Sequence, residues 1–143
     1  MSESETILII DDEAPVRAVM RRLLATHDVV TVSSGNEAVA ILEHDRSFDL
    51  ILCDLMMPGM TGVDVHHWLV IHDPVLAARL VFVTGGAFGP VAAEYVRQAG
   101  NPKLQKPFDN DAVKDVVMAT IRVSRSEPPT RLDIPVRKPR DGT

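Results

Sequence analysis

Four apolar runs of strand length and a fifth, short strand-like segment recur along the chain, and segments with helical spacing of their apolar residues separate them. The runs are rich in Val, Ile and Leu, which is typical of strands that are covered on both faces. Because strands and helices alternate with short loops, we expect a parallel sheet with helices on both faces and right-handed crossovers. The predicted strands are 6–10, 29–32, 48–54, 80–84 and 103–106. The predicted fold class is therefore α/β, with a doubly wound, five-stranded parallel sheet.

Capping residues and helix breakers mark the predicted helices between these runs. Ser34, with Glu37 three residues later, has the pattern of a capping box. Thr61 and Asp64 indicate a second capped helix start. The other signals are Pro15 in the first turn of the first helix, Asp73-Pro74 and Gly100 as helix ends, and Asp109 as the cap of the last helix.

The composition favours one domain followed by a tail. A chain of 143 residues with 45% hydrophobic residues can bury a single sizeable core. From residue 124 onwards the periodicity is lost, and prolines and basic residues become frequent. We therefore expect a domain at residues 1–123 and a flexible tail or linker at residues 124–143.

Charge, cysteine usage and hydropathy argue against several classes of protein. The formal net charge is -5 and the sequence pI about 5.4, so nothing in the overall charge favours direct binding to nucleic acid. The single cysteine, Cys53, cannot form an internal disulfide, which is typical of a reducing compartment. The N-terminus lacks the pattern of a signal peptide, and no apolar run approaches the roughly 20 residues that span a bilayer. We expect a cytoplasmic protein without membrane contact.

Polar residues stand at the carboxyl ends of four predicted strands. Asp11 and Asp12 follow the first strand, Asp54 ends the third, Thr84 ends the fourth and Lys106 ends the fifth. Ligands of doubly wound sheets bind outside these strand ends. Three neighbouring carboxylates raise one another's pKa unless a cation lies among them, and hard oxygen ligands suit Mg²⁺. A carboxylate is also a nucleophile towards phosphorus, and Lys106 and Thr84 could then assist phosphoryl transfer.

Together with their neighbours, these residues resemble the receiver domain of two-component response regulators. The resemblance covers about residues 5–123, and the intervals between the matching segments agree with the family. It implies a (βα)5, flavodoxin-like receiver fold and a phosphorelay signalling module. The matching segments are Ile9-Ile10-Asp11-Asp12-Glu13, Asp54-Leu55-Met56-Met57-Pro58-Gly59-Met60-Thr61-Gly62, Val83-Thr84-Gly85 and Lys106-Pro107-Phe108.

The resemblance implies that Asp54 accepts a phosphoryl group from a phosphohistidine of a partner histidine kinase or histidine phosphotransfer protein. Asp12 and Asp54 would bind Mg²⁺ directly, and Asp11 would act mainly through water. The backbone carbonyl of Met56 would complete the protein's share of the Mg²⁺ ligands. The chain would not be an enzyme acting on other molecules, because it would catalyse only its own phosphoryl transfer and dephosphorylation.

The response to phosphorylation is also implied by the resemblance. Lys106 would pair with a phosphoryl oxygen, and Thr84 would move to donate a hydrogen bond to the same group, which would change the surface offered to a downstream protein. By the same analogy, the Lys106-Pro107 bond is a candidate cis peptide.

The chain departs from the family pattern at three positions. Lys103 stands where the family usually carries an aromatic residue that moves with the threonine, so that coupling cannot be transferred. Tyr95 is a substitute for the aromatic residue in one interpretation and an ordinary packing residue in the other. Met56 and Gly86 offer neither an acid nor an amide that could position a hydrolytic water, which predicts a long-lived aspartyl-phosphate.

Several alternatives remain open from the sequence. The chain is either a stand-alone regulator or a receiver from a hybrid histidine kinase or a longer regulator, and homodimerisation is a further alternative. A pseudo-receiver would bind partners without phosphorylation. A phosphatase of the aspartyl-phosphate type is disfavoured because its second Asp is missing two residues after Asp54. A dinucleotide-binding domain is disfavoured because no Gly-x-Gly-x-x-Gly follows the first strand.

Overall fold

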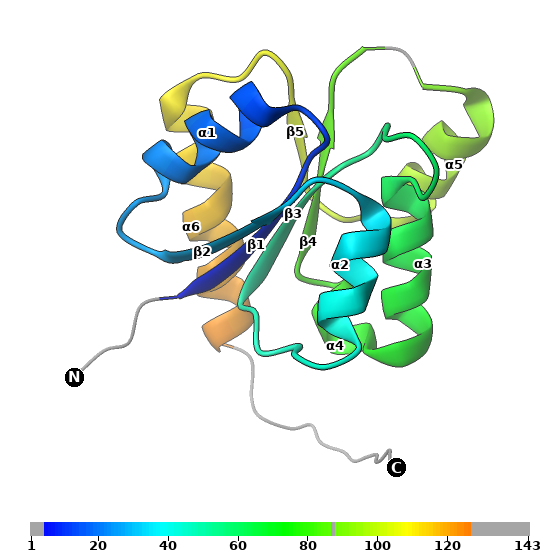
Figure 1. The fold of residues 1–143 in the computed structure, drawn as a ribbon, viewed down its shortest axis with the longest axis horizontal. Coiled ribbons are helices and arrows are strands. Elements are labelled where there is room, and N and C mark those ends of the chain that lie inside the picture. Colours follow the sequence, from blue (N-terminus) through cyan, green and yellow to red (C-terminus); the bar gives the residue numbers. More distant parts are fainter. Residues whose placement is uncertain (1–4, 87, 127–143) are drawn as a thin grey trace.

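The computed structural model describes residues 5–86 and 88–126, and these form one parallel five-stranded sheet in the order β2-β1-β3-β4-β5. The predicted doubly wound α/β fold is confirmed (Figure 1). In chain order the elements are β1 (Thr6–Ile10), α1 (Ala14–Leu23), β2 (Asp28–Val32), α2 (Gly35–Leu42), β3 (Leu50–Asp54), α3 (Gly62–His72), α4 (Pro74–Ala77), β4 (Leu80–Thr84), α5 (Pro90–Ala99), β5 (Lys103–Gln105) and α6 (Asn110–Ser126).

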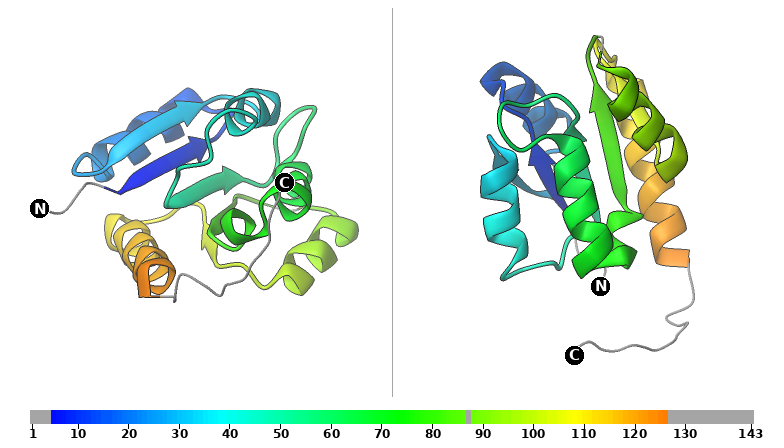
Figure 2. Two further views of the ribbon diagram at one scale, coloured as in Figure 1. Left: turned by 90° about the horizontal axis from the view of Figure 1, so that it is seen from below. Right: turned by 90° about the vertical axis from the view of Figure 1, so that its right-hand side faces the viewer.

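Helices cover both faces of the sheet, so the three central strands are buried along almost their whole length (Figures 1 and 2). On one face, Leu8, Ile51 and Phe82 pack in a core with residues of α2, α3 and α5. On the other face, Ile9 and Leu52 pack in a second core with residues of α1 and α6. Burying each large aliphatic side chain contributes about 1.5–3 kcal/mol, which explains why these strands are continuous apolar runs instead of alternating ones.

The strand register aligns the carboxyl ends of the four strands that carry the predicted site residues. Ile10 of β1 pairs with Cys53 of β3, so Asp11 comes to lie next to Asp54. Asp54 pairs with Val83, which places Asp54 and Thr84 at the same edge. Since β1 lies between β2 and β3, the strand order reverses between β1 and β3, where doubly wound sheets bind their ligands.

The two predicted N-terminal caps behave differently. At α3, Asp64 N donates to Thr61 Oγ1 (3.3 Å) and Thr61 N donates to Asp64 Oδ2 (2.9 Å), which is a complete capping box. At α2, Glu37 N donates to Ser34 Oγ (3.1 Å), as expected for a cap. The Glu37 carboxylate, however, accepts from the backbone N and Oγ of Ser33 and not from Ser34, so the predicted capping box is only half formed.

The remaining helix signals also have defined roles. Asp73 ends α3 and its side chain then caps α4, a four-residue helix that the sequence did not predict. Gly100 adopts a left-handed conformation (φ 74°) after α5, and Asp109 Oδ1 accepts from Ala112 N at 2.7 Å. The Lys106-Pro107 peptide bond is cis.

The C-terminal boundary differs slightly from the expectation. The last helix runs to Ser126, so the first three residues assigned to the tail are helical. The rest of the predicted tail, residues 127–143, lies outside the described residues. Within the part of the chain that the structure describes, no helix is long and apolar enough to cross a bilayer.

Gly62 allows α3 to start directly against the end of β3. A Cβ at this position would lie 2.5 Å from the carbonyl oxygen of Asp54 and 2.9 Å from Cα of Leu55, and both are backbone atoms. The Gly62 N–H also donates to the Leu55 carbonyl at 3.0 Å. The backbone that carries Asp54 is therefore held by a contact that only glycine permits.

We expect Gly62→Ala to lower the free energy of unfolding by about 1–3 kcal/mol, because the added methyl group must displace backbone atoms. Gly89→Ala is the matched control, since a Cβ there meets nothing within 4 Å among the described residues; its expected cost is about 0.5 kcal/mol. Urea unfolding at equilibrium compares the two variants. Equal stabilities would contradict the steric argument.

Candidate functional site

The structure brings the three predicted carboxylates together at the carboxyl edge of the sheet. One oxygen from each of Asp11, Asp12 and Asp54 can be chosen so that all three lie within 4.8 Å of one another. Asp11 and Asp54 are buried, with 2% and 5% of their surface exposed, whereas Asp12 is exposed. Two carboxylates are thus fixed by the fold, and a third faces solvent.

Lys106 reaches this group of acids from the end of β5. Its Nζ lies 3.1 Å from Asp11 Oδ2 and 3.7 Å from Asp54 Oδ2. Its backbone N donates to the Thr84 carbonyl at 2.7 Å, which ties the ends of β4 and β5 together. Gly85 makes room for the lysine stem, because a Cβ there would lie 2.9 Å from Lys106 Cδ. Thr84 itself is buried at the end of β4.

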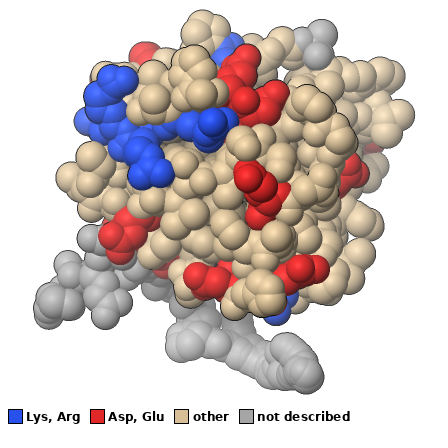
Figure 3. Space-filling view, in the orientation of Figure 1, with Lys and Arg blue, Asp and Glu red and all other residues tan. Residues whose placement is uncertain are grey.

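Asp11 is held in place by backbone groups and by a basic helix. Its Oδ1 accepts from Glu13 N at 2.9 Å, and its carbonyl accepts from Arg17 Nη1 at 2.6 Å. Arg17, Arg21 and Arg22 all belong to α1. Lys and Arg side chains gather on the face of the molecule where α1 lies, close to acidic groups (Figure 3).

The electrostatics of the site favour occupation by a cation. Burial and then the negative charge of Asp11 raise the pKa of Asp54 to about 6, although Lys106 and the Met56 N–H act in the opposite direction. Burial lowers the pKa of Lys106, but its hydrogen bond and charge interaction with Asp11, and the charges of Asp54 and Glu13, outweigh this effect and raise it overall. The single ammonium of Lys106 does not fully offset the negative charge of these carboxylates.

A hard divalent cation fits the residues that are present. Three carboxylates within 4.8 Å of one another offer oxygen ligands only, and one of them is open to solvent. Mg²⁺ prefers this kind of ligand set and retains several waters. Met56 lies in the loop after Asp54 with 49% of its surface exposed, and ligation by its carbonyl remains a prediction.

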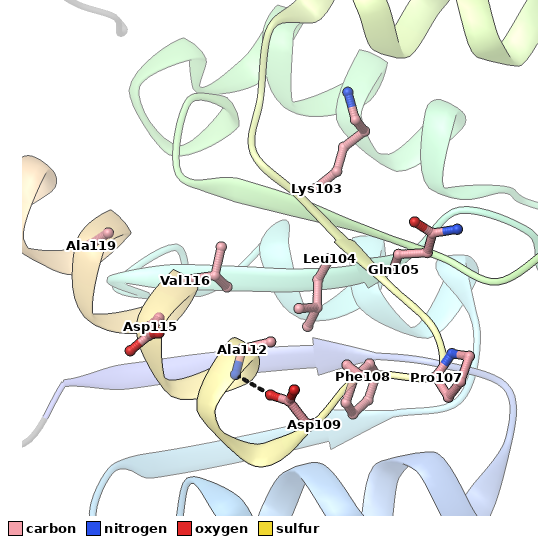
Figure 4. A pocket seen from close by; sticks show the side chains of 10 residues that line it. All are labelled: Lys103, Leu104, Gln105, Pro107, Phe108, Asp109, Ala112, Asp115, Val116 and Ala119. Atoms are coloured by element: carbon pink, nitrogen blue, oxygen red, sulfur yellow. Dashed lines mark hydrogen bonds between the residues drawn. The ribbon is translucent and has the colours of Figure 1, made fainter.

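The region of α5 and β5 departs from the family pattern because Lys103 replaces the usual aromatic residue, as the sequence indicated. Lys103 is exposed on the edge strand β5, beside a hollow of about 510 Å³ between β5 and α6 (Figure 4). The Tyr95 hydroxyl is 2.7 Å from His66 Nδ1, and the buried His66 ring packs 5.3 Å from the Phe82 ring. Tyr95 is thus hydrogen-bonded to a histidine between α3 and α5, which agrees with the packing interpretation.

Two side-chain contacts near the site and in the neighbouring core were not predicted from the sequence. Glu13 Oε1 lies 3.4 Å from Lys106 Nζ, and the only available signal was a third acid after Asp11-Asp12. The second contact joins Tyr95 to His66, which is buried and whose pKa is lowered by this burial. Cys53 lies in the core, and burial raises the pKa of its thiol well above the usual range.

Comparison with known proteins gives a consistent set of similarities. The model of the response regulator receiver domain family matches residues 7–118. The regulatory protein LuxO of Vibrio vulnificus (strain YJ016) is 34% identical over 116 residues, which cover 80% of this chain and 25% of LuxO. The DNA-binding transcriptional regulator NtrC of Salmonella typhimurium is 28% identical over 131 residues, covering 90% of this chain and 27% of NtrC.

Solved structures resemble the chain over most of its length. A response regulator receiver protein from Sinorhizobium medicae WSM419 has a TM-score of 0.72 and 26% identity, covering 85% of this chain and 98% of that one. A CheY-like receiver domain protein from Methanospirillum hungatei JF-1 has a TM-score of 0.77 at 21% identity, with coverage of 86% and 98%, and shows the shared fold. The chain spans about a quarter of the length of the first curated relatives it matches.

Asp54→Asn is expected to stabilise the metal-free protein at neutral pH. The folded-state pKa of Asp54, about 6, lies above the ordinary value of 3.8, so the wild type loses stability as pH rises from about 4 through about 6. At pH 7 the variant should gain up to about 3 kcal/mol, at roughly 1.4 kcal/mol per pKa unit. Below pH 4 the two proteins should differ little.

Urea unfolding in the presence of a chelator, from pH 4 to pH 7.5, measures this difference. Asp28→Asn, at an exposed aspartate of β2, is the control and should leave the pH dependence unchanged. A variant less stable than the wild type at pH 7 would show that Lys106 already compensates the Asp54 charge fully.

Proposed function

The chain belongs to the response regulator receiver domain family of two-component signalling, and we propose that it is switched by phosphorylation of Asp54. The observation that carries this proposal is the position of Asp54 itself. It is a buried carboxylate at a strand end, with two further acids within 4.8 Å and an ammonium 3.7 Å away. Phosphoryl transfer requires this combination of nucleophile, metal ligands and fixed positive charge.

The charges of the site support the role of Asp54 as the nucleophile. Its pKa of about 6 leaves most of the carboxylate ionised at pH 7. We propose that an Asp54 oxygen attacks the phosphorus of a phosphohistidine, so that the P–O bond forms as the P–N bond breaks and the histidine leaves. Lys106 then pairs with a phosphoryl oxygen, and the Thr84 hydroxyl donates a hydrogen bond to the same group.

Asp11, Asp12 and Asp54 would hold Mg²⁺, with the Met56 carbonyl as a further ligand. When bound, the ion would neutralise the carboxylates and orient the phosphoryl oxygens. The residues of the chain provide the remaining contributions. Asp11 is oriented by Glu13 N, and Lys106 already lies near both Asp11 and Asp54.

The phosphodonor partner would be a histidine kinase or a histidine phosphotransfer protein, and a downstream protein would bind the altered surface. NtrC is named as a DNA-binding regulator, but this chain corresponds to about a quarter of such relatives. We assign no direct nucleic-acid contact to a chain with a net charge of -5. The alternative, a pseudo-receiver that binds partners without phosphorylation, is disfavoured because the acidic residues and Lys106 lie together.

Incubation with acetyl phosphate and Mg²⁺ tests the proposed function. Intact mass should show one phosphoryl adduct on the wild type and none on Asp54→Ala, because the acceptor oxygen is missing. Asp28→Asn is the control and should be modified normally. Omission of Mg²⁺ should reduce the adduct strongly. Absence of an Asp54-dependent adduct would favour the pseudo-receiver.

The aspartyl-phosphate should persist for minutes or longer after the donor is removed. Met56 and Gly86 flank the site and provide no side chain that positions a water for attack on phosphorus. Met56→Asn should shorten the lifetime several-fold, because an amide can hydrogen-bond that water. Met118→Asn, at an exposed methionine of α6, is the matched control. Loss of the wild-type adduct within seconds would rule out this account of the lifetime.

A further inference from the structure

The Lys106 ammonium contacts a third carboxylate that lies outside the proposed metal site. Nζ is 3.4 Å from Glu13 Oε1, compared with 3.1 Å from Asp11 Oδ2. The Glu13 side chain is 60% exposed, whereas that of Lys106 is only 18% exposed. Glu13 is not one of the three acids that can share a metal ion. Its charge can therefore be removed without removing a proposed ligand or the proposed acceptor.

Hydrogen bonds fix the backbone of Glu13, and its carboxylate forms an ion pair with Lys106. Its N–H donates to Asp11 Oδ1, and its carbonyl accepts from Val16 N and Arg17 N in the first turn of α1. Glu13 is the N-cap residue of α1, yet its carboxylate makes no capping hydrogen bond among the described residues. It lies instead 3.4 Å from Nζ of Lys106, a residue 93 positions away in the chain.

We propose that Glu13 is a positioning residue that restrains Lys106 in the resting state and so slows phosphorylation of Asp54. This inference rests on the proposed function. During transfer, Lys106 must direct its charge to the phosphoryl oxygens, and every contact that it keeps with Glu13 competes with that role. An exposed ion pair is weak, so this contact adjusts the rate of transfer without preventing it.

Glu13→Gln removes the charge and keeps the size of the side chain. Under saturating Mg²⁺ and low ionic strength, we expect the rate constant for Asp54 phosphorylation by acetyl phosphate to rise about two- to fivefold, the range set by a weak, exposed ion pair. Glu43→Gln, at an exposed glutamate that caps the far end of α2, removes an equal charge elsewhere and should leave the rate unchanged. Quenched time points read by intact mass give the rates.

Two further variants separate the contact from a general effect of charge. In a Lys106→Met background, Glu13→Gln should no longer raise the rate, because the restrained ammonium is absent. Glu13→Asp keeps the negative charge but shortens the side chain by one methylene, so it should accelerate phosphorylation much as Glu13→Gln does. If the Lys106→Met protein is phosphorylated too slowly to measure, the rate of Glu13→Asp alone tests whether the contact with Lys106 is responsible.

The outcomes distinguish this inference from the function on which it rests. Normal Asp54 phosphorylation with an unchanged rate in Glu13→Gln would overturn the inference alone. The same holds if Glu13→Asp behaves like the wild type, or if Glu13→Gln accelerates the Lys106→Met protein equally, because the charge would then act only by repelling the donor. Absence of any Asp54-dependent adduct on the wild type would overturn the proposed function as well.

Discussion

The close approach of two buried carboxylates, Asp11 and Asp54, is the constraint around which the functional end of the sheet is organised. The pairing of β1 with β3 makes this approach unavoidable, because Ile10 and Cys53 are register partners and each is followed by an aspartate. Two like charges in a partly desolvated position are unfavourable. Lys106, placed by β5 at 3.1 Å and 3.7 Å from the two acids, reduces the repulsion.

The compensation by Lys106 is incomplete, which supports the proposal that the site binds a cation. The pKa of Asp54 remains raised to about 6 despite Lys106, so the metal-free site retains an unfavourable negative charge. Binding of a divalent cation would relieve this charge and at the same time prepare the oxygen atoms for an incoming phosphoryl group. The same imbalance that costs stability in the resting protein thus favours ligand binding, as is common at functional sites.

The carboxyl end of the sheet follows the family pattern more closely than the region of α5 and β5 does. At the carboxyl end of the sheet, Asp11, Asp12 and Asp54 lie within 4.8 Å of one another, and Lys106 lies beside Asp11. On the side of α5 and β5, Lys103 is exposed, and the only tyrosine is hydrogen-bonded to the buried His66. The proposed response of Thr84 to phosphorylation therefore cannot pass through a tyrosine on β5. Phe82, two residues before Thr84 and 5.3 Å from the His66 ring, connects the same strand to α3 and α5.

The sequence by itself determined the strands, most helix ends and the set of candidate site residues. Buried parallel strands require continuous apolar runs, and caps such as Thr61–Asp64 are local hydrogen bonds, so both leave a direct signal in the chain. Only the tertiary structure decided which polar groups meet. The contacts of Glu13 with Lys106 and of His66 with Tyr95 join residues 93 and 29 positions apart. They depend on how the elements pack, and packing brings together side chains whose spacing in the sequence carries no periodic pattern.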